Sequence, residues 1–453
     1  MHGAVHDLAQ SVFGEKFSRM EETDDSYVNV GTRHLSIVCE KIPAKTFEAT
    51  YKCKSLRTFL VFGERGTIIS EVPHSLFLKL GRLRVLDLSS TQIEELTKSV
   101  GNLKHLRFLD LSNTLLKWLP ETIQDLGVLQ TLRLVNCSEL LSLPKSTSRL
   151  KGLRHLELDG NNQLTSMPNG IGRLTGLQTI SEFVIGPENG QMKELKNMND
   201  IRGTLRIRQL EKVRNPQEAL EANLANKIYL DELDLQWSSV ADARNDEYVL
   251  DKLMTSPHEN LKKLTLQKYG GRMFPKWVSS PLFSKLTSIF FNECKNCGLL
   301  PPLGQLPRLK SLKIVGMHEL TKVDRTFLGV GDVARFPSLE TLELRDLPML
   351  EGWVGVGEED MASLREITIS ECPEMVILPS FHHLRSLQKL EFESCTQISS
   401  FSEQRLASSV KTLIIIDCPM LEERCKRNGD DWTMIEHIPY IEIDYENLKE
   451  SEP

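Results

Sequence analysis

Three groups of residues in this sequence have the types and spacing that chemistry requires. Cys294 and Cys297 form a Cys-x-x-Cys pair, which is the ligand spacing of many zinc sites. His382 and His383 are adjacent and could serve as metal ligands or as general bases. The segment 329–334 partly resembles the glycine turn of a dinucleotide site, but no amphipathic helix follows it. Each group therefore has to be weighed against the elements that would position it.

Carboxylates form a fourth group. Asp87, Asp110 and Glu157 recur at one position of a repeated string, and paired carboxylates can act as general acid and base. A charge that recurs along one face of an array more often marks a solvated face. The sequence contains no Gly-Lys pair of a phosphate loop, no G-x-S-x-G and no recognisable Cys/His nucleophile arrangement. We therefore predict that this chain is not an enzyme.

The dominant signal is an internal repeat. The string LRVLDLSST, which begins at Leu83, returns 23 residues later as LRFLDLSNT. The repeat recurs about 16 times in all, if a degenerate copy at Thr204–Ile207 is counted with the regular copies that follow here. The frame L-x-x-L-x-L, with other apolar residues allowed, begins at Leu56, Leu83, Leu106, Leu129, Leu153, Leu177, Leu230, Leu261, Leu286, Leu309, Leu339, Leu364, Leu387, Val410 and Ile438. This frame and a period near 23 residues are typical of leucine-rich repeats.

The period predicts the architecture. Each copy supplies a short strand, a turn and a return segment, and its leucines can be buried only between neighbouring copies. Leu-Pro pairs such as Leu119-Pro120 and Leu143-Pro144 begin the return segments, where proline ends strand pairing. We therefore predict an α/β leucine-rich-repeat solenoid, a curved horseshoe with parallel strands on its concave face, with a short helical segment at the N-terminus.

Five of the nine cysteines occupy one position of the repeat. They lie eight residues after a frame start, where other copies place Thr91, Thr114 or Asn161, and they are Cys137, Cys294, Cys372, Cys395 and Cys418. A small polar side chain at this position caps backbone groups at the end of the strand. Cys294 is thus a structural residue, and we predict no metal site at the Cys294/Cys297 pair.

The remaining candidates for function are side chains on the concave face. Strand side chains alternate, so the variable positions of the frame point away from the leucine core. Trp237, Phe108 and Phe290 are aromatic residues among charged neighbours and are candidate hot spots, although scattered surface residues need no function. The predicted protein-binding residues are Arg84, Asp87, Arg107, Phe108, Asp110, Arg133, Arg154, His155, Glu157, Trp237, Lys263, Lys268, Phe290, Lys313, Arg345 and Glu391.

Composition limits the classes of partner. The chain has 453 residues, 40% of them hydrophobic, and a net charge of −7, which argues against nucleic acid as a partner. No apolar run reaches the roughly 20 residues that span a bilayer, and no signal peptide precedes the repeats. We expect a cytoplasmic protein, with the nucleus and the periphery of the plasma membrane as alternatives.

The N-terminal residues lie outside the repeat. Met1, Val5, Leu8 and Val12 have helical spacing, so residues 1–20 are predicted to form an amphipathic helix that an acidic linker follows. We expect residues 1–30 to be the end of a preceding region and residues 31–453 to be the repeat domain.

Four segments of the chain resemble one known family, the plant intracellular immune receptors of the coiled-coil, nucleotide-binding, leucine-rich-repeat class. They are residues 1–10, 83–114, 269–277 and 418–439. Met1-His2-Gly3 resembles the Met-His-Asp motif that closes the nucleotide-binding region, with glycine in place of the aspartate. The resemblance implies that His2 faces ADP or ATP in a nucleotide-binding domain. This chain alone lacks that domain, so no cofactor is expected of it.

The same resemblance implies a function in recognition and restraint. The concave face would bind a pathogen effector or a guarded host protein, and the early repeats would pack on a nucleotide-binding module. We expect the arginines of the early copies to serve that second contact. The alternative is a free-standing leucine-rich-repeat scaffold that bridges signalling proteins.

Overall fold

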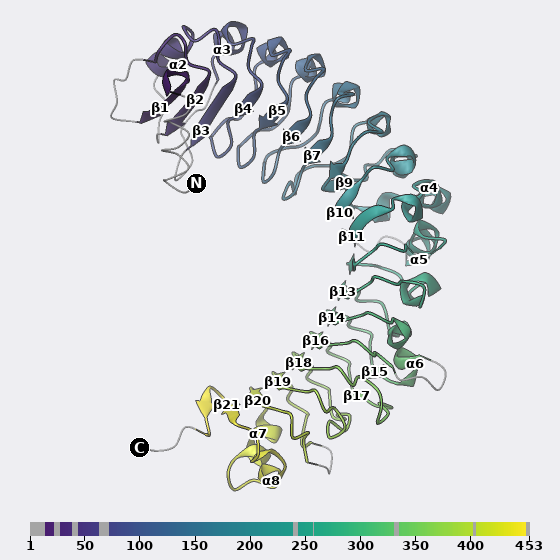
Figure 1. The fold of residues 1–453 in the computed structure, drawn as a ribbon. Helices are drawn as coiled ribbons and strands as arrows, with labels where there is room; N and C mark the ends of the chain where they lie inside the picture. The colour runs from purple at the N-terminus through teal and green to yellow at the C-terminus, as the bar shows by residue number, and fades with distance from the viewer. Residues whose placement is uncertain are drawn as a thin grey trace. The chain divides into compact units, whose positions relative to one another are not determined.

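The computed structural model describes residues 14–21, 28–38, 44–62, 72–238, 243–256, 258–329, 335–401 and 405–449. The chain divides into two compact units, Met1–Leu205 and Arg206–Pro453, and each is described by itself. Figure 1 labels most of the strands and the α-helices of both units. The expected nucleotide-facing residue His2 lies outside the described residues, as does the segment Gly331–Ala334 of the candidate glycine turn.

The first unit contains a parallel sheet in which every strand pairs with the strand of the next copy. Its strands are β1 (Phe17–Glu21), β2 (His34–Val38), β3 (Thr58–Phe62), β4 (Val85–Asp87), β5 (Phe108–Asp110), β6 (Thr131–Arg133), β7 (His155–Glu157) and β8 (Thr179–Ile180). The strands β9 (Glu182–Val184) and β10 (Arg202–Arg208) follow, and the boundary between the units falls inside β10.

Short helices form the return side of this unit. They are α2 (Ala44–Thr50), α3 (His74–Lys79), η2 (Lys98–Asn102), η3 (Glu121–Asp125), η4 (Lys145–Arg149), η5 (Ile171–Arg173) and η6 (Met192–Asn197), while η1 (Gly14–Lys16) directly precedes β1. Pro120 and Pro144 are the N-cap residues of η3 and η4, as the Leu-Pro pairs predicted. Apart from the α-helices α2 and α3, these are short 3-10 helices, because a copy of about 23 residues leaves little chain for the return.

The second unit repeats the arrangement. Its strands follow the sheet order β10 to β14, β16 and β18 to β22, with parallel pairing from β11 to β21 and an antiparallel pair at the end. They are β11 (Tyr229–Gln236), β12 (Lys263–Gln267), β13 (Ser288–Asn292), β14 (Ser311–Val315), β16 (Thr341–Arg345), β18 (Glu366–Ser370), β19 (Lys389–Glu393), β20 (Thr412–Ile416), β21 (Tyr440–Ile443) and β22 (Glu446–Asn447).

The return side of the second unit is more helical and holds a small second sheet. That sheet pairs β15 (Lys322–Val323) with β17 (Gly352–Trp353). The helices are η7 (Leu210–Lys212), α4 (Pro216–Glu221), η8 (Leu224–Asn226), α5 (Ala243–Leu253), η9 (Lys276–Ser279), η10 (Leu303–Gln305), α6 (Arg325–Leu328), α7 (Pro419–Cys425) and α8 (Trp432–Ile435). No helix of the described residues is long and apolar enough to cross a bilayer.

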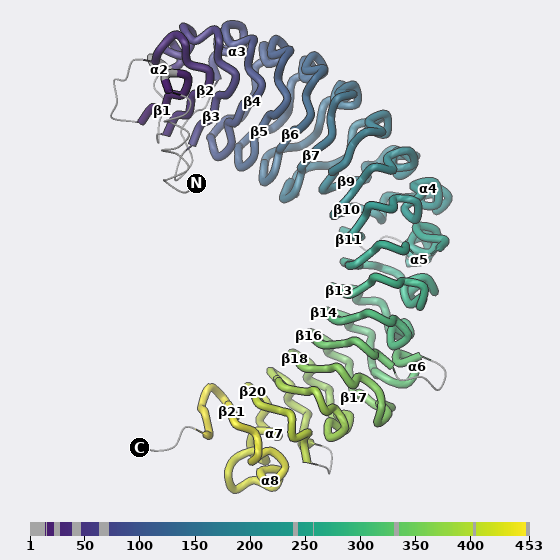
Figure 2. Tube along the Cα trace, viewed as in Figure 1, coloured from purple at the N-terminus to yellow at the C-terminus, as the bar shows by residue number. Residues whose placement is uncertain are grey.

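The repeat frame predicted these strands correctly. Fourteen of the fifteen frame starts lie two residues before the first residue of a strand. The frame leucines are buried, as Leu83, Leu86 and Leu88 illustrate with no exposed surface. Within each unit the strands lie on the inner side and the return segments on the outer side (Figure 2). The leucine-rich-repeat solenoid is therefore confirmed.

The N-terminal segment differs from the prediction. The expected helix does not extend through residue 20, because Phe17–Glu21 is strand β1, which pairs in register with β2. Met20 points into the core and is 7% exposed. The helical spacing of apolar residues ends at Val12, and backbone pairing with the next copy takes over beyond it. Strand β1 also lies before residue 31, where we placed the start of the repeats.

A ladder of small polar side chains joins successive copies in the first unit. Thr114 Oγ1 donates to Leu111 O at 2.7 Å, and Cys137 Sγ donates to the same oxygen from the next copy at 3.2 Å. Asn161 follows in the ladder, with Nδ2 donating to Leu134 O and to Leu158 O at 2.7 Å. Its Oδ1 accepts the Cys137 N–H at 2.8 Å. The capping role predicted for this position is confirmed.

Asn161→Leu should destabilise the first unit by about 2–4 kcal/mol, because three buried backbone groups lose their partner at once. Chemical denaturation followed by circular dichroism measures this change. The matched control is Asn162→Leu, since Asn162 is exposed and belongs to the same turn. Equal unfolding midpoints for the two variants would contradict the capping role.

One copy of the second unit carries a lysine where several copies of the first unit carry leucine. Lys227 is the C-cap residue of η8, the position that Leu126 and Leu150 occupy after η3 and η4. The side chain has no exposed surface. Burial lowers the pKa of its ammonium group from 10.5 to about 8. Between those pH values the unfolded chain holds a proton that the folded chain lacks, so this group makes stability rise with pH.

Lys227→Met should therefore remove the rise of the unfolding free energy with pH that Lys227 causes. Below about pH 8 the wild type bears the full cost of the buried charge, and that cost fades as pH approaches 10.5. The advantage of the variant should shrink by about 2–3 kcal/mol between neutral pH and pH 10. Buried thiols titrate with the opposite sign, but they are common to both proteins and cancel in the difference. A pH-independent difference would contradict the buried charge.

Candidate protein-binding face

The candidate site is the exposed face of the strands, and its first unit carries two distinct rows of charged residues. The residue after the first frame leucine gives one row, and the residue between the last two frame leucines gives the other. Neighbouring strands lie about 4.8 Å apart, so residues in one row are direct neighbours. The sequence grouped the early arginines into one patch, and the structure divides them between these rows.

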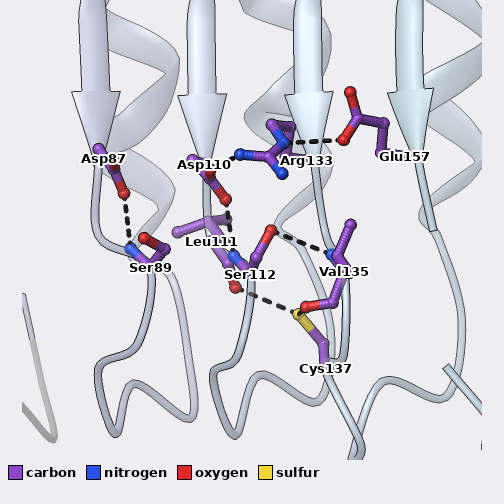
Figure 3. Close-up of polar contacts among 9 residues, drawn as sticks. All are labelled: Asp87, Ser89, Asp110, Leu111, Ser112, Arg133, Val135, Cys137 and Glu157. Carbon is purple, nitrogen blue, oxygen red and sulfur yellow. Dashed lines mark hydrogen bonds and ion pairs between the residues drawn. The ribbon is translucent and has the colours of Figure 1, made fainter. Parts of the chain in front are cut away.

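The inner row is an ion-pair network across three strands. Arg133 on β6 donates from Nη1 to Asp110 Oδ2 at 2.6 Å and from Nε to Glu157 Oε2 at 2.8 Å (Figure 3). Asp110 Oδ1 also accepts the Ser112 N–H at 2.9 Å. Asp110 is 2% exposed, which corrects the expectation that the recurring acids lie on a solvated face. The two carboxylates raise the pKa of the Arg133 guanidinium, with the hydrogen bond to Glu157 as the largest cause.

Asp87 and His155 extend this arrangement at either side. Asp87 Oδ1 accepts the Ser89 N–H at 2.9 Å, as Asp110 does with Ser112 (Figure 3). Burial raises the pKa of the Asp87 carboxyl. His155 Nδ1 lies 3.1 Å from Thr179 Oγ1. All these polar groups are occupied by neighbours, so the inner row organises the sheet and offers little to a partner.

The outer row, which we call the arginine row, consists of Arg33, Arg57, Arg84, Arg107 and Arg154, with Gln130 between the last two. The Arg107 N–H donates to Arg84 O and the Gln130 N–H to Arg107 O, both at 2.8 Å, so the positions are consecutive. Arg84, Arg107 and Arg154 are exposed, and none has a carboxylate within ion-pair distance among the described residues. Arg33 and Arg57 contribute to the lowered pKa of His34, after burial, which is the larger cause.

Sequence reasoning missed the first two members of the arginine row. Arg57 follows the frame leucine Leu56, so the frame itself contained the signal. Arg33 was hidden because Thr32, buried without exposed surface, replaces the leucine of its copy. Phe108 lies half-buried on β5 beside this row.

The second unit presents several charges that are paired with a residue of a neighbouring copy. Lys263 pairs with Glu232 at 2.6 Å, and Lys313 pairs with Glu343 at 2.8 Å. The remaining candidates are Lys268 with Glu293 at 3.9 Å, Arg345 with Glu371 at 2.7 Å, Glu391 with Lys389 at 2.7 Å, and half-buried Phe290. Exposed pairs of this kind contribute little to stability, but they set the pattern of charge on the face.

The prediction that Trp237 is a surface hot spot is wrong, because its side chain is 2% exposed. The chain turns inward after Gln236, and the indole packs edge-on against Tyr269 of the next copy, with ring centroids 5.1 Å apart. Tyr269 lies eight residues after a frame start, at the position where other copies carry Thr114, Cys137 or Asn161. A side chain at Gly271 would collide with its hydroxyl. The indole N–H of Trp277 donates to Leu250 O in α5 at 2.9 Å. The motif around residues 269–277 therefore packs the fold.

The cysteine and histidine pairs show structural roles. Cys294 and Cys297 are buried, and Cys297 Sγ donates to Gly271 O at 3.0 Å. Burial raises the pKa of the Cys294 thiol to about 12, which keeps it protonated. His382 Nδ1 lies 2.6 Å from Ser380 Oγ on the return side. The described residues contain no cluster of three or more groups suited to hold a metal ion.

Arg133→Met should destabilise the first unit by about 2–4 kcal/mol, because it leaves the buried Asp110 carboxylate without its cation. Arg107→Met removes the same charge from the arginine row and should change stability by no more than about 0.5 kcal/mol. Urea denaturation of both variants gives the comparison. Similar losses for the two would contradict the division into a structural row and an open row.

Comparison with known proteins relates this chain to plant proteins named for disease resistance. It is 38% identical over 422 residues to the disease resistance RPP13-like protein 1 of Arabidopsis thaliana, covering 87% of this chain and 40% of the relative. It is 36% identical over 433 residues to disease resistance protein RGA2 of Solanum bulbocastanum, covering 93% and 41%. The chain thus spans about two fifths of the length of these curated relatives.

A family described as R13L1/DRL21 LRRs matches residues 192–317. Among solved structures, a leucine-rich-repeat protein of Leptospira interrogans aligns with a TM-score of 0.56 at 19% identity, covering 96% of this chain and 98% of that one. At that identity the likeness supports the fold alone. The repeat fold and the relatives together favour a binding module over a catalytic domain.

Proposed function

The chain is a leucine-rich-repeat homologue of plant disease resistance proteins, and we propose that it serves plant defence as a recognition and restraint module. In this proposal the strand face of the second unit recognises a pathogen effector or an effector-modified host protein. The arginine row of the first unit contacts a nucleotide-binding signalling module. The observation that carries the proposal is the contrast between the arginine row, whose exposed members have no ion pair among the described residues, and the second unit, where Lys262, Lys263, Lys310 and Lys313 pair with acids of the preceding or following copy.

Like charges on neighbouring strands repel each other and cost stability. An acidic surface opposite the arginine row would offset that repulsion, which favours an acidic contact on the partner module. The paired charges of the second unit give a face of alternating sign instead. Such a pattern selects among partners, because a wrong partner places like charges together.

The two contacts would form a switch. A ligand that prefers the released state over the restrained state shifts the balance by its difference in affinity. Nucleotide would act through the partner module, and the nucleotide-facing role of His2 stays a prediction.

The test is a binding measurement between this chain and a separately expressed nucleotide-binding module of a similar receptor. Arg84→Glu combined with Arg107→Glu should weaken binding by about tenfold or more, because charge reversal creates repulsion where attraction was. The matched control is Lys193→Glu with Lys196→Glu, an equal charge change on the exposed part of η6 on the return side. Biolayer interferometry gives the affinities and thermal unfolding checks the fold.

Unchanged binding of the arginine-row variant would overturn the assignment of that row. A folded wild-type chain that binds no such module, with or without residues 1–26, would favour the free-standing scaffold.

A further inference from the structure

A cavity of about 240 Å³ lies on the return side of the first unit, away from the strand face. Residues of η3, η4 and η5, which belong to three successive copies, line it. A single water needs only about 10–15 Å³ on such a measure, so the space admits a small ligand.

Positive charge dominates the cavity. Lys145, Arg149 and Arg173 line it and are exposed, and none forms an ion pair within the described part of the chain. Glu121 is the one carboxylate in the lining, and its Oε2 already accepts the Ser146 N–H at 3.2 Å. Arg149 Nη1 donates to Gln124 Oε1 at 2.6 Å, which holds the guanidinium at the cavity. Three cations against one engaged carboxylate leave a net positive site.

A buried hydroxyl without a partner lies in the same lining. Ser146 is 4% exposed, and its Oγ has no hydrogen-bond partner in the structure. A buried polar atom left in this state costs about 1–3 kcal/mol. The equivalent serine two copies earlier, Ser99, is satisfied, since its Oγ lies 2.8 Å from Thr97 Oγ1. Pro144 stands where Thr97 stands in that copy, so the internal partner of Ser146 has been removed.

We propose that this cavity binds a phosphate monoester. The dianion matches the excess positive charge, its oxygens accept charge-assisted hydrogen bonds from the guanidinium and ammonium groups, and the Ser146 hydroxyl donates to one of them. The ester is either a free metabolite or the headgroup of a membrane lipid, since both present the same chemistry. The site is independent of the contacts assigned to the strand face.

The experiment uses two probes. Isothermal titration calorimetry with glycerol phosphate tests the soluble source. Flotation with phosphatidylcholine vesicles that contain phosphatidic acid, a monoester, tests the lipid source. Vesicles with phosphatidylglycerol, an anionic diester, are the control for charge alone. Binding to either monoester probe above that control supports the proposal and identifies the source.

Two variants and one matched control distinguish a specific site from attraction by general positive charge. Lys145→Gln should weaken binding about fivefold or more, whereas Lys98→Gln removes the same charge at the same position of an earlier copy and should not. Ser146→Ala should weaken binding several-fold with an unchanged or raised unfolding midpoint, because it deletes an unsatisfied hydroxyl. The proposal is overturned if neither monoester binds above the diester control, if Lys98→Gln loses as much as Lys145→Gln, or if Ser146→Ala binds like the wild type.

Discussion

The structure depends on one constraint: the leucines of a single copy cannot be buried by that copy. Each L-x-x-L-x-L frame places its apolar side chains on one side of a short strand, and only the copies before and after can cover them. Stacking then brings the strands of successive copies into parallel register, so residues at one frame position become a continuous row. The core, the polar ladder and the charged faces all follow from this regular stacking of copies.

The regular stacking also explains why polar residues whose types could suggest catalysis or metal binding instead support the fold. Thr114, Cys137 and Asn161 occupy one position in successive copies, and each supplies a hydrogen bond to a backbone carbonyl that the strand leaves open. The Cys294/Cys297 pair belongs to the same system, with its thiols buried and protonated. In a repeat, a residue type that recurs at the period serves first the interface between copies, and departures from the period mark where to look for function.

Two departures stand out in the first unit. Arginine recurs along the arginine row, and its exposed members have no acidic partner within the part of the chain that the structure describes, whereas Lys262 and Lys310 at the same position of the second unit pair with acids of neighbouring copies. On the return side, proline replaces a threonine and leaves the hydroxyl of Ser146 without its internal partner. In both places the chain retains an unfavourable arrangement that its own neighbouring copies satisfy elsewhere. An external partner is the simplest physical compensation.

The sequence by itself determined the repeat, its register and the buried frame, because burial of periodic leucines requires no knowledge of distant contacts. It also located Arg84, Arg107 and Arg154 and the capping position of Cys137 and Asn161, since these follow the period. Only the tertiary structure showed that Arg133 is clamped between Asp110 and Glu157, that Trp237 turns inward onto Tyr269, and that Phe17–Glu21 joins the sheet. Those outcomes depend on which side chain of the adjacent copy lies within reach. A one-dimensional pattern specifies the row, but the contact across the row is decided by packing.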